Sequence, residues 1–419
     1  MASTPTAIVL GAGMVGSVMA VDLATGTGST DALAVTIADS RPEALERARA
    51  RAAAAGCSID TIEADLADPA VLRNAIEPFD IVLGALASSI GFATLRTVIE
   101  AGKDYCDISF MPEDAIDLDA LARKHDVTAI VDCGVAPGMS NLLAARGVAM
   151  LDRADSIEIY VGGLPRERRR PFEYKAGFSP ADVIEEYTRP ARIVEGGEIV
   201  VRPALSEPEL MDFAGVGTLE SFNTDGLRSL AYTMKVPDMK EKTLRYPGHI
   251  ELMRVFRETG LFGHDEIEVG GTRDGAPGVR VKPIDVISKL MFPKWTYEPD
   301  EEDLTVMRIV VEGEPPAGHG RGAAAGGDGG RRVRHPGRRE RHTWDLLDFY
   351  DKKTRATSMS RTTAIPCTIM ARLVAAGSLR QPGVNPPELL GADEHLVEHV
   401  LAEHRARGIE YHHRVETIG

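Results

Sequence analysis

The chain has 419 residues, of which 43% are hydrophobic and 26% are charged, and its formal net charge is −15. This length predicts two domains, and the composition is that of an ordinary globular protein. The negative charge argues against nucleic acid or an anionic membrane as the main partner, and no apolar run approaches the roughly 18 residues that span a bilayer.

The cysteines are scattered along the chain without the C-x-x-C spacing of a zinc site or a disulfide framework. They are Cys57, Cys106, Cys133 and Cys367. Most are expected to be small core residues, and their pattern fits a reduced cytoplasm. The first predicted strand begins so early that a signal peptide is not expected. We therefore predict a cytoplasmic protein without a metal site.

A dinucleotide-binding fingerprint opens the chain. Residues 7–10 are an apolar run typical of a buried strand, and Gly11-Ala12-Gly13-Met14-Val15-Gly16 follows directly, before a predicted helix over 17–24. The first glycine permits a tight turn, the second lets the backbone approach a pyrophosphate, and the third lets helix and strand pack closely. The pyrophosphate binds the free N–H groups at the helix N-terminus, so a Rossmann site is predicted.

A second strand is expected over 34–38 and ends at Asp39, at the distance where Rossmann proteins place an acidic residue. A carboxylate there accepts hydrogen bonds from a ribose 2′-hydroxyl, which favours NAD and repels the 2′-phosphate of NADP. Ser40 and Arg41 follow. Arg41 can stack on adenine or reach a phosphate, or it can be a solvated residue at a helix start. NAD is therefore the predicted cofactor, with NADP as the alternative.

Strands and helices keep alternating through the first third of the chain. Further strands are expected over 58–63, 80–85, 104–108 and 128–132, with a helix over 114–124. This alternation predicts an α/β fold with a doubly wound parallel sheet, in which ligands lie outside the carboxyl ends of the strands. The rule selects these residues as facing the cofactor or substrate: Asp39, Asp65, Leu66, Ala85, Leu86, Ala87, Asp107, Asp132 and Cys133.

The pattern changes after Gly134. The turn over 135–141 leads into a helix that Ser140 or Asn141 could cap, and Asn141 could instead contact a ligand. Alternating strands then predict a largely antiparallel sheet in a second, α+β domain that closes over the nicotinamide. These strands are expected over 157–161, 198–201, 266–269 and 306–311.

The domain boundaries follow from these patterns. We expect a Rossmann domain over 1–134, a substrate-binding and dimerisation domain over 135–354, and a C-terminal tail over 393–419. The intervening segment 355–392 contains an apolar helix over 362–377 that ends at a glycine. This helix is expected to pack back on the first domain.

One segment differs from its surroundings, because residues 318–341 contain seven arginines and eight glycines. The segment, assigned to 315–342, is an insertion without core-forming capacity or the product of a shifted reading frame; a basic loop for an acidic partner is the third interpretation. It separates strands expected over 306–311 and 344–347. These strands could form an edge hairpin that pairs two subunits, so a homodimer is expected.

Several motifs in the same order resemble the saccharopine dehydrogenase family, and the likeness covers nearly the whole chain except 318–341. Besides the Rossmann start, they are Gly134-Val135-Ala136-Pro137-Gly138, Tyr160-Val161-Gly162-Gly163-Leu164-Pro165, Pro203-Ala204-Leu205-Ser206-Glu207, Leu219-Glu220-Ser221-Phe222 and Glu241-Lys242-Thr243-Leu244-Arg245-Tyr246-Pro247-Gly248-His249. Within the family, His249 fits the lysine 6-dehydrogenases, which the chain resembles most, whereas Tyr174-Lys175 looks more like the saccharopine enzymes. Asp39 departs from the basic or neutral residue of members that use NADP.

The resemblance implies an NAD(P)-dependent oxidoreductase that acts at a carbon–nitrogen bond of a lysine-derived amino acid. In lysine 6-dehydrogenases the ε-amine is oxidised to an imine, water releases ammonia, and the semialdehyde cyclises. In glutamate-forming saccharopine dehydrogenases a secondary amine is oxidised and split. An NAD(H)-binding regulator without turnover is the alternative from another class.

Such chemistry needs a base, because an amine with a pKa near ~10.4 must lose a proton before hydride leaves its carbon. His249 is the first candidate, and Asp107 and Lys175 are its rivals. The substrate's α-carboxylate needs an arginine that binds it in bidentate fashion. The candidate substrate-binding residues are Arg245, Arg228, Asn141 and Tyr174. Each candidate also has a plain structural role as its alternative: a core histidine, an ion pair or a turn cap.

Overall fold

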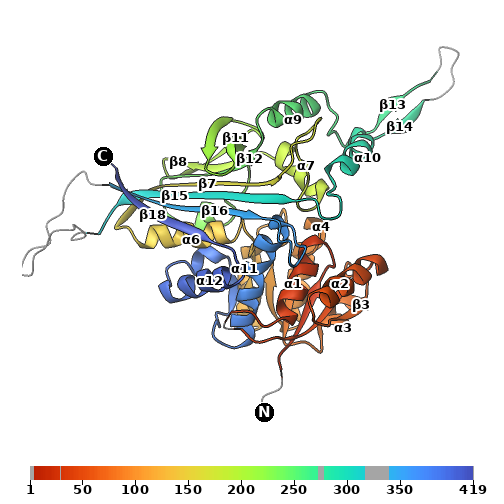
Figure 1. Cartoon of the computed structure of the whole chain (residues 1–419), viewed down its shortest axis with the longest axis vertical. Coiled ribbons are helices and arrows are strands. Elements are labelled where there is room, and N and C mark those ends of the chain that lie inside the picture. The colour runs from red at the N-terminus through yellow and green to blue at the C-terminus, as the bar shows by residue number, and fades with distance from the viewer. Residues whose placement is uncertain (1–3, 29, 272–277, 317–338, 419) are drawn as a thin grey trace, which may run out of the picture.

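The computed structural model describes residues 4–28, 30–271, 278–316 and 339–418. Two sheets dominate it, a 7-stranded sheet formed by the first third of the chain and a 9-stranded sheet formed by most of the rest. Figure 1 shows the second sheet lying across one end of the first. This α/β architecture, with a parallel and a mostly antiparallel sheet, agrees with the fold class predicted from the sequence.

The first sheet has the doubly wound order β17-β6-β5-β4-β1-β2-β3, and all its pairs are parallel. Its strands are β1 Thr6–Leu10, β2 Ala34–Asp39, β3 Asp60–Glu63, β4 Ile81–Gly84, β5 Asp104–Asp107, β6 Thr128–Ile130 and β17 Gly383–Asn385. The apolar residues of β1 and β4 are fully buried, as a strand covered on both faces requires. The six expected strands are confirmed, and β17 is added from far downstream.

Helices cover both faces of this sheet. They are α1 Met14–Ala24, α2 Pro42–Ala54, α3 Pro69–Ile76, α4 Ser88–Glu100, α5 Asp119–Lys124 and α6 Met139–Ala149. The helix expected over 114–124 begins as a 3-10 turn, Ala115–Leu118, which Asp114 caps. The expectation that Ser140 or Asn141 caps α6 is wrong, because Gly138 occupies the N-cap and makes no side-chain bond.

The second sheet has the order β10-β11-β12-β7-β15-β16-β18, with β8 and β9 attached at β12. Its strands are β7 Arg153–Pro165, β8 Ala191–Glu195, β9 Glu198–Arg202, β10 Glu209–Phe213, β11 Gly217–Asn223, β12 Asp238–Arg245, β15 Asp303–Glu314, β16 Arg339–Phe349 and β18 Tyr411–Ile418. Its pairs are antiparallel except that β12 runs parallel to β7. The helices that pack near it are α7 Pro180–Thr188, α8 Leu230–Thr233, α9 His249–Glu258 and α10 Pro283–Trp295.

The hairpin expected over 306–311 and 344–347 exists, since β15 and β16 pair with Val306 opposite Leu347. It does not form an edge. β15 also pairs with β7, and β16 also pairs with β18, so neither strand has a free side for a second subunit. A homodimer stays a prediction that needs another surface.

Three other expectations change. Residues 339–342, assigned to the Arg-rich segment, belong to β16, whereas 317–338 lie outside the described residues. The expected C-terminal tail is instead α12 Glu394–Ala406 followed by β18. The strand expected over 266–269 is β13 Ile267–Val269, which pairs with β14 Val279–Val281 in a separate hairpin projecting from the body (Figure 1).

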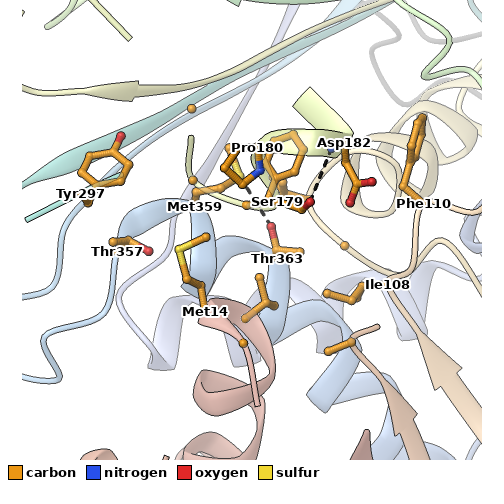
Figure 2. Close-up of a pocket in the computed structure, with 18 of the residues that line it drawn as sticks. Met14, Ile108, Phe110, Ser179, Pro180, Asp182, Tyr297, Thr357, Met359 and Thr363 are labelled. Atoms are coloured by element: carbon orange, nitrogen blue, oxygen red, sulfur yellow. Dashed lines mark hydrogen bonds between the residues drawn. The ribbon is translucent and has the colours of Figure 1, made fainter. Parts of the chain in front are cut away.

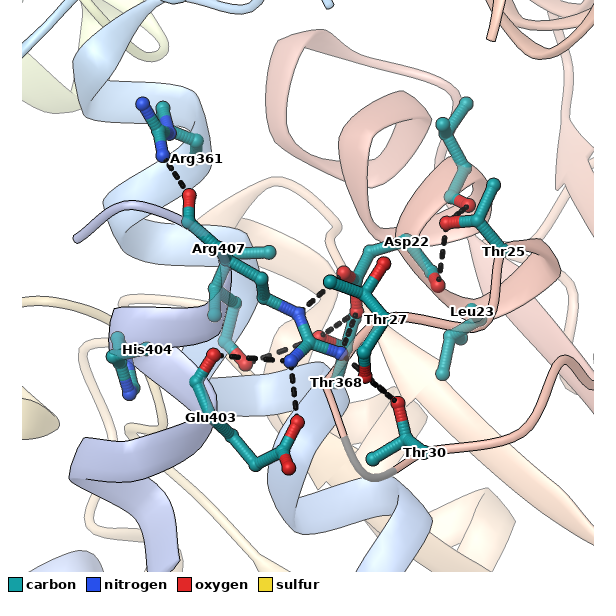
Figure 3. A network of polar contacts seen from close by, with 12 residues as sticks. Asp22, Leu23, Thr25, Thr27, Thr30, Arg361, Thr368, Glu403, His404 and Arg407 are labelled. Atoms are coloured by element: carbon teal, nitrogen blue, oxygen red, sulfur yellow. Dashed lines mark hydrogen bonds and ion pairs between the residues drawn. The ribbon is translucent and has the colours of Figure 1, made fainter. Parts of the chain in front are cut away.

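The helix expected over 362–377 is α11 Ser358–Ala375, and it packs against α1 as predicted. A buried polar network fastens this contact (Figure 3). Asp22 of α1 accepts hydrogen bonds from Thr368 Oγ1 at 2.7 Å and from Arg407 Nε at 2.6 Å, and Arg407 also pairs with Glu403 at 2.6 Å. The helix that carries the glycine fingerprint is thus held by the last part of the chain.

Within the described ranges, no helix combines the length and apolar character needed to cross a bilayer. The same ranges contain no cluster of three or more His, Cys, Asp or Glu side chains arranged for a metal ion. The cysteines are free thiols, with Cys106, Cys133 and Cys367 buried and Cys57 half-buried. They are packing residues, as the sequence predicts for most of them.

Candidate functional site

A cavity of about 1180 Å³ lies between the carboxyl ends of the first sheet and the second sheet. Residues that follow β1, β4, β5 and β6 line one side, and residues of β7, β12 and α7 line the other. The cavity therefore occupies the place where open parallel sheets bind their ligands. Its volume suits a dinucleotide together with a small substrate.

The fingerprint glycines have the geometry that a bound pyrophosphate requires. A Cβ on Gly11, whose φ is +99°, would lie 2.4 Å from the Ala85 carbonyl oxygen, and one on Gly16 would lie 1.9 Å from the Gly11 carbonyl oxygen. A Cβ on Gly13 would meet no heavy atom within 4 Å. Gly11 and Gly16 are therefore needed for packing. Gly13 instead borders open space at the N-terminus of α1, where phosphate oxygens bind.

Most of the predicted cofactor residues reach this space. The cofactor wall, as we name it, consists of Gly13, Met14, Val15, Gly16, Arg41, Ala85, Leu86 and Ala87, all of which line the cavity. The remaining predicted cofactor residues do not line it: Gly11, Asp39, Ser40, Asp65 and Leu66. The sequence reasoning missed Arg47, Ala50 and Arg51 of α2, which do line the cavity and whose spacing of three and four residues could have revealed one helix face.

Asp39 is turned toward the protein. Its Oδ2 accepts a hydrogen bond from the Ala12 amide at 2.8 Å, and its Oδ1 accepts one from the Arg41 amide at 2.9 Å. Burial tends to raise the pKa of this carboxyl, but the Arg41 side chain and the two amides outweigh burial and hold the pKa below its usual value. Asp39 is therefore a charged group that fixes the glycine loop.

Mainly apolar side chains line the cavity between its two sides. Figure 2 shows Met14, Ile108, Met359 and Thr363 converging between the two sheets. Asp182 of α7, on the side of the second sheet, accepts a hydrogen bond from Ser88 Oγ of α4, on the side of the first sheet, at 2.8 Å. This bond crosses between the layers, so the two sides of the cavity are linked by a direct polar contact.

Strand β12 supplies a row of polar side chains on the other side. Glu241, Thr243 and Arg245 are two residues apart, so they lie on one face of the strand, and all three line the cavity. Together with Tyr174 and Glu186 they form what we call the amine wall. The aromatic and polar composition of this wall fits a small polar substrate.

Arg245 lines the cavity, but each of its three side-chain nitrogens already donates to a protein group. It pairs with Glu186 at 2.5 Å, donates to Tyr187 Oη at 3.1 Å and to the Leu244 carbonyl at 3.0 Å, and lies 4.4 Å from the centre of the Tyr174 ring. Only 3% of its side chain is exposed. Arg245 and Tyr174 thus meet at the cavity as the sequence suggested, but the guanidinium is held by the protein.

Glu241 is a residue that the sequence reasoning did not select. Its Oε2 accepts a hydrogen bond from Thr224 Oγ1, which in turn contacts Thr243 Oγ1 at 3.0 Å. Burial raises the pKa of Glu241 to about 8; the Thr224 bond opposes the rise, and the neighbouring Glu186 and Asp225 add to it. Glu241 opens the sequence motif that ends at His249, and its spacing of four residues from Arg245 places the two on one face of β12.

The structure does not bring His249 to the cavity wall. Its Nε2 lies 3.0 Å from Tyr187 Oη and its Nδ1 lies 3.0 Å from the Phe172 carbonyl oxygen, so both ring nitrogens have partners. Burial, together with the positive charge of Arg245, lowers its pKa to about 3. His249 is therefore a neutral core histidine at physiological pH.

Lys175 does not line the cavity either. Its Nζ pairs with Glu301 at 2.5 Å and donates to the Thr296 carbonyl at 3.0 Å. Both side chains of the pair are nearly buried, and Nζ is directed at these two acceptors rather than at the cavity. The geometry gives Lys175 a structural role.

Asp107 lies beneath the cavity floor, and its neighbours Ile108 and Phe110 line it. Its Oδ1 accepts hydrogen bonds from the amide and the hydroxyl of Ser109, and burial raises its pKa to about 7. Asp107 therefore titrates near neutrality, but it is fully buried.

The other two predicted substrate residues are held away from the cavity wall. Arg228 Nε lies 3.4 Å from Asp132 Oδ2, and its guanidinium covers the Phe110 ring at 4.8 Å. Asn141 donates to Glu388 Oε2 at 3.2 Å and is fully buried. Both side chains contact protein groups and do not line the cavity.

Carboxyl groups outnumber guanidinium groups around the amine wall. The carboxyl side chains that line this part of the cavity are Asp182, Glu185, Glu186, Asp225 and Glu241, and the guanidinium side chains are Arg189 and Arg245. Arg189 is paired with Glu185 and Arg245 with Glu186. Once Glu241 has lost its proton, this excess of carboxyl groups favours a cationic group over an anionic one.

Comparisons with known proteins agree with this geometry. Residues 7–130 match the family model described as the saccharopine dehydrogenase NADP binding domain, and residues 134–409 match the one described as the saccharopine dehydrogenase C-terminal domain. The apo, histidine-tagged saccharopine dehydrogenase (L-Glu forming) of Saccharomyces cerevisiae has the same fold, with a TM-score of 0.73, 17% identity, and coverage of 99% of this chain and 100% of the other.

Curated relatives are more distant in sequence. The alpha-aminoadipic semialdehyde synthase of Arabidopsis thaliana is 22% identical over 409 residues, which cover 78% of this chain but 36% of that protein. The saccharopine dehydrogenase [NADP(+), L-glutamate-forming] of Saccharomyces cerevisiae is 24% identical over 237 residues, which cover 53% and 52%. The chain thus matches well under two thirds of the length of these relatives. The two family matches together span both sheets, and on their evidence the chain belongs to the saccharopine dehydrogenase family, with an NAD(P)-binding first domain.

Proposed function

We propose that this protein is an NAD(P)-dependent oxidoreductase that oxidises the ε-amine carbon of L-lysine to an imine, from which water releases ammonia and a semialdehyde. The observation that carries the proposal is the carboxyl-rich side of the cavity, with Glu241 in the amine wall, facing the cofactor wall. A carboxylate-rich wall binds an ammonium group, and the open space at Gly13 accepts a pyrophosphate.

The proposed cofactor supplies an acceptor for hydride when it is bound. The residues that would hold it are the free amides at the start of α1, with Arg41 of the cofactor wall and Arg47 and Arg51 of α2, which also line the cavity. Asp39 supports NAD, because its charge disfavours a 2′-phosphate, whereas the arginines of α2 favour NADP. We propose NAD as the preferred cofactor and NADP as a usable one.

Saccharopine is the second candidate substrate, and the names of the relatives favour it. It carries three carboxylates, which would face a wall where the arginines Arg189 and Arg245 are already paired with Glu185 and Glu186. The electrostatics therefore support lysine as the first candidate.

The test is the formation of reduced nicotinamide from NAD and from NADP with lysine, saccharopine, ornithine and glutamate at alkaline pH. We expect absorbance to rise with lysine, accompanied by one ammonia per reduced cofactor. A rise with saccharopine alone, accompanied by glutamate, would transfer the assignment to the second candidate. Cofactor binding without turnover on any of these amines would contradict both and favour a regulatory role.

A further inference from the structure

The proposed reaction needs a group that accepts the proton of the substrate amine. The structure holds His249 and Lys175 in other bonds, and it buries Asp107 beneath the floor. A carboxyl group nevertheless lines the cavity in the row that β12 presents, namely Glu241. A base must stand within hydrogen-bond reach of the proton that it takes, and of these four groups only Glu241 contributes to the wall.

Glu241 is fixed in position by its surroundings. The residue is 4% exposed, and its Oε2 is the acceptor of the Thr224 hydroxyl. A Cβ on Gly226 would lie 2.2 Å from Glu241 Oε2, so only glycine lets this loop approach the carboxyl group so closely. Thr243, the next residue on the same face, is joined to Thr224 as well. The carboxyl group is therefore pre-positioned, as a group that exchanges a proton with substrate must be.

The charged groups near Glu241 come from three segments of the chain. Glu186 belongs to α7, Asp225 follows β11, and Arg245 lies on β12 itself. Asp225 is paired with Arg192 of β8 at 2.8 Å, and Glu186 is paired with Arg245. Burial dominates this balance and raises the pKa of Glu241 to about 8, so the group holds a proton at neutral pH and loses it at the alkaline side.

We infer that Glu241 is the residue that binds the reacting amine of the substrate and accepts its proton. The inference rests on the proposed function. In the step, the Glu241 carboxylate takes H⁺ from the substrate ammonium, and the freed nitrogen lone pair forms the C=N bond. Hydride leaves the adjacent carbon for the oxidised nicotinamide of the cofactor, so the products are the glutamic acid form of Glu241, an iminium ion and reduced cofactor.

The experiment counts the protons that substrate binding releases, without any turnover. L-lysine is titrated calorimetrically into the full-length protein saturated with NADH, in buffers of different ionisation enthalpy, at pH 7 and pH 9. An ammonium group that binds beside protonated Glu241 displaces its proton. Wild type should therefore release close to one proton per bound lysine at pH 7, and this release should largely disappear at pH 9.

Glu241→Gln should abolish the release at pH 7 while NADH binding persists, and NADH binding also shows that the variant is folded. Glu198→Gln, which removes an exposed carboxylate of β9, is the matched control and should behave as wild type. If the release persists in Glu241→Gln, or disappears instead in Asp107→Asn, the inference is wrong. If lysine supports turnover but no proton is released by wild type at pH 7, it is wrong as well.

A second measurement covers the case in which Glu241→Gln does not fold. Thr224→Val removes the hydrogen bond that stabilises the charged carboxylate, so the pKa of Glu241 should rise. The acid limb of the kcat/KM profile, which we expect near pH 8 in wild type, should then move to higher pH. An unmoved limb would overturn the assignment. Where Glu241→Gln folds, loss of the base should lower kcat by ~10²–10⁴-fold.

Different results would reject lysine oxidation as the function and Glu241 as the base. If saccharopine and not lysine supports turnover, the same proton count is made with saccharopine, since its secondary amine must also lose a proton. If no amine binds to the NADH complex, the proposed function fails and the role of Glu241 fails with it. If an amine binds and turns over but Glu241→Gln retains its pH profile, the proposed function stands and this inference alone is rejected.

Discussion

The cofactor wall and the amine wall face each other across one cavity but are built differently. The cofactor wall comes largely from a motif in which the glycines, the helix start and the acidic residue follow one another closely along the chain. The amine wall joins Arg245 to Tyr174, 71 residues earlier, and to Glu186, 59 residues earlier. Local backbone geometry therefore defines the first wall, whereas side-chain pairing over long separations defines the second.

Substitutions in the two walls should therefore have different effects. In the cofactor wall a side chain added to a glycine changes the space available to a ligand. In the amine wall the loss of one partner leaves a buried charge without its counter-ion. A side chain at Gly13 should thus affect cofactor affinity, and removal of one partner of the Arg245–Glu186 pair should affect the stability of the whole protein.

The largest effect is expected for Arg245→Ala. Removal of this side chain leaves the Glu186 carboxyl group poorly solvated and without its partner, and breaking a buried pair costs ~3–5 kcal/mol. The free energy of unfolding, measured by urea denaturation, should fall by that amount. Arg189→Ala is the matched control, because Arg189 pairs with Glu185 four residues earlier in the chain, and this pair is more exposed than the Arg245–Glu186 pair. The Arg189→Ala substitution should lower the free energy of unfolding by no more than ~1 kcal/mol. Equal losses for both variants would contradict the comparison.

Gly13→Ala should be the next in size. Its Cβ meets no protein atom within 4 Å but enters the space expected for the pyrophosphate. Cofactor affinity, measured by NADH fluorescence, should fall by about 100-fold, since the glycine is needed for close backbone approach. The melting temperature should stay near that of wild type. Gly16→Ala is the contrast, because its Cβ would lie 1.9 Å from the Gly11 carbonyl oxygen and should lower the melting temperature too.

Asp39→Asn should have an intermediate effect on cofactor choice. Loss of the negative charge removes the repulsion of a 2′-phosphate while Arg41 remains, so the ratio of kcat/KM with NADP to that with NAD should rise by about tenfold, or ~1.4 kcal/mol. The hydrogen bond from the Ala12 amide to Asp39 is weakened, so NAD affinity should fall as well. An unchanged ratio would show that Asp39 acts on the loop alone.

The smallest effect on catalysis is expected for His249→Asn. The imidazole is neutral above pH ~4, because its pKa of about 3 lies far below the ordinary value. The folded pKa is depressed, so this buried histidine destabilises the fold only at acid pH, where the unfolded chain is protonated. The pH profile of kcat/KM should keep its shape, and kcat should change by less than tenfold. If the kcat/KM profile of His249→Asn lost an inflection near neutral pH, His249 and not Glu241 would be the base.

The interpretation of His249 illustrates why the site was harder to predict than the fold. Its residue type suits proton transfer, and its position four residues beyond Arg245 suggested a shared site. Whether a histidine titrates near neutrality depends on what surrounds it, and here Tyr187, Phe172 and Arg245 come from separate segments. The same limit hid Glu241, whose role depends on burial and on a loop held close by Gly226.

The edge hairpin expected over 306–311 and 344–347 shows a similar limit for the sheet. The alternation of side chains identified both strands and their pairing correctly. The pattern of one strand carries no information about how many neighbours it has, so β7 and β18 were not foreseen beside them. The position of β18 depends on α12 and on the end of the chain.

The sequence by itself determined the doubly wound first sheet, the glycine turn and the family, because these depend on local periodicity and on residues close together in the chain. The tertiary structure decided which side chains face the cavity. It paired Arg245 with Glu186, placed His249 in the core and brought Glu241 to the wall. The physical reason is that charge, burial and hydrogen bonding at a site are set by neighbours far apart in the sequence.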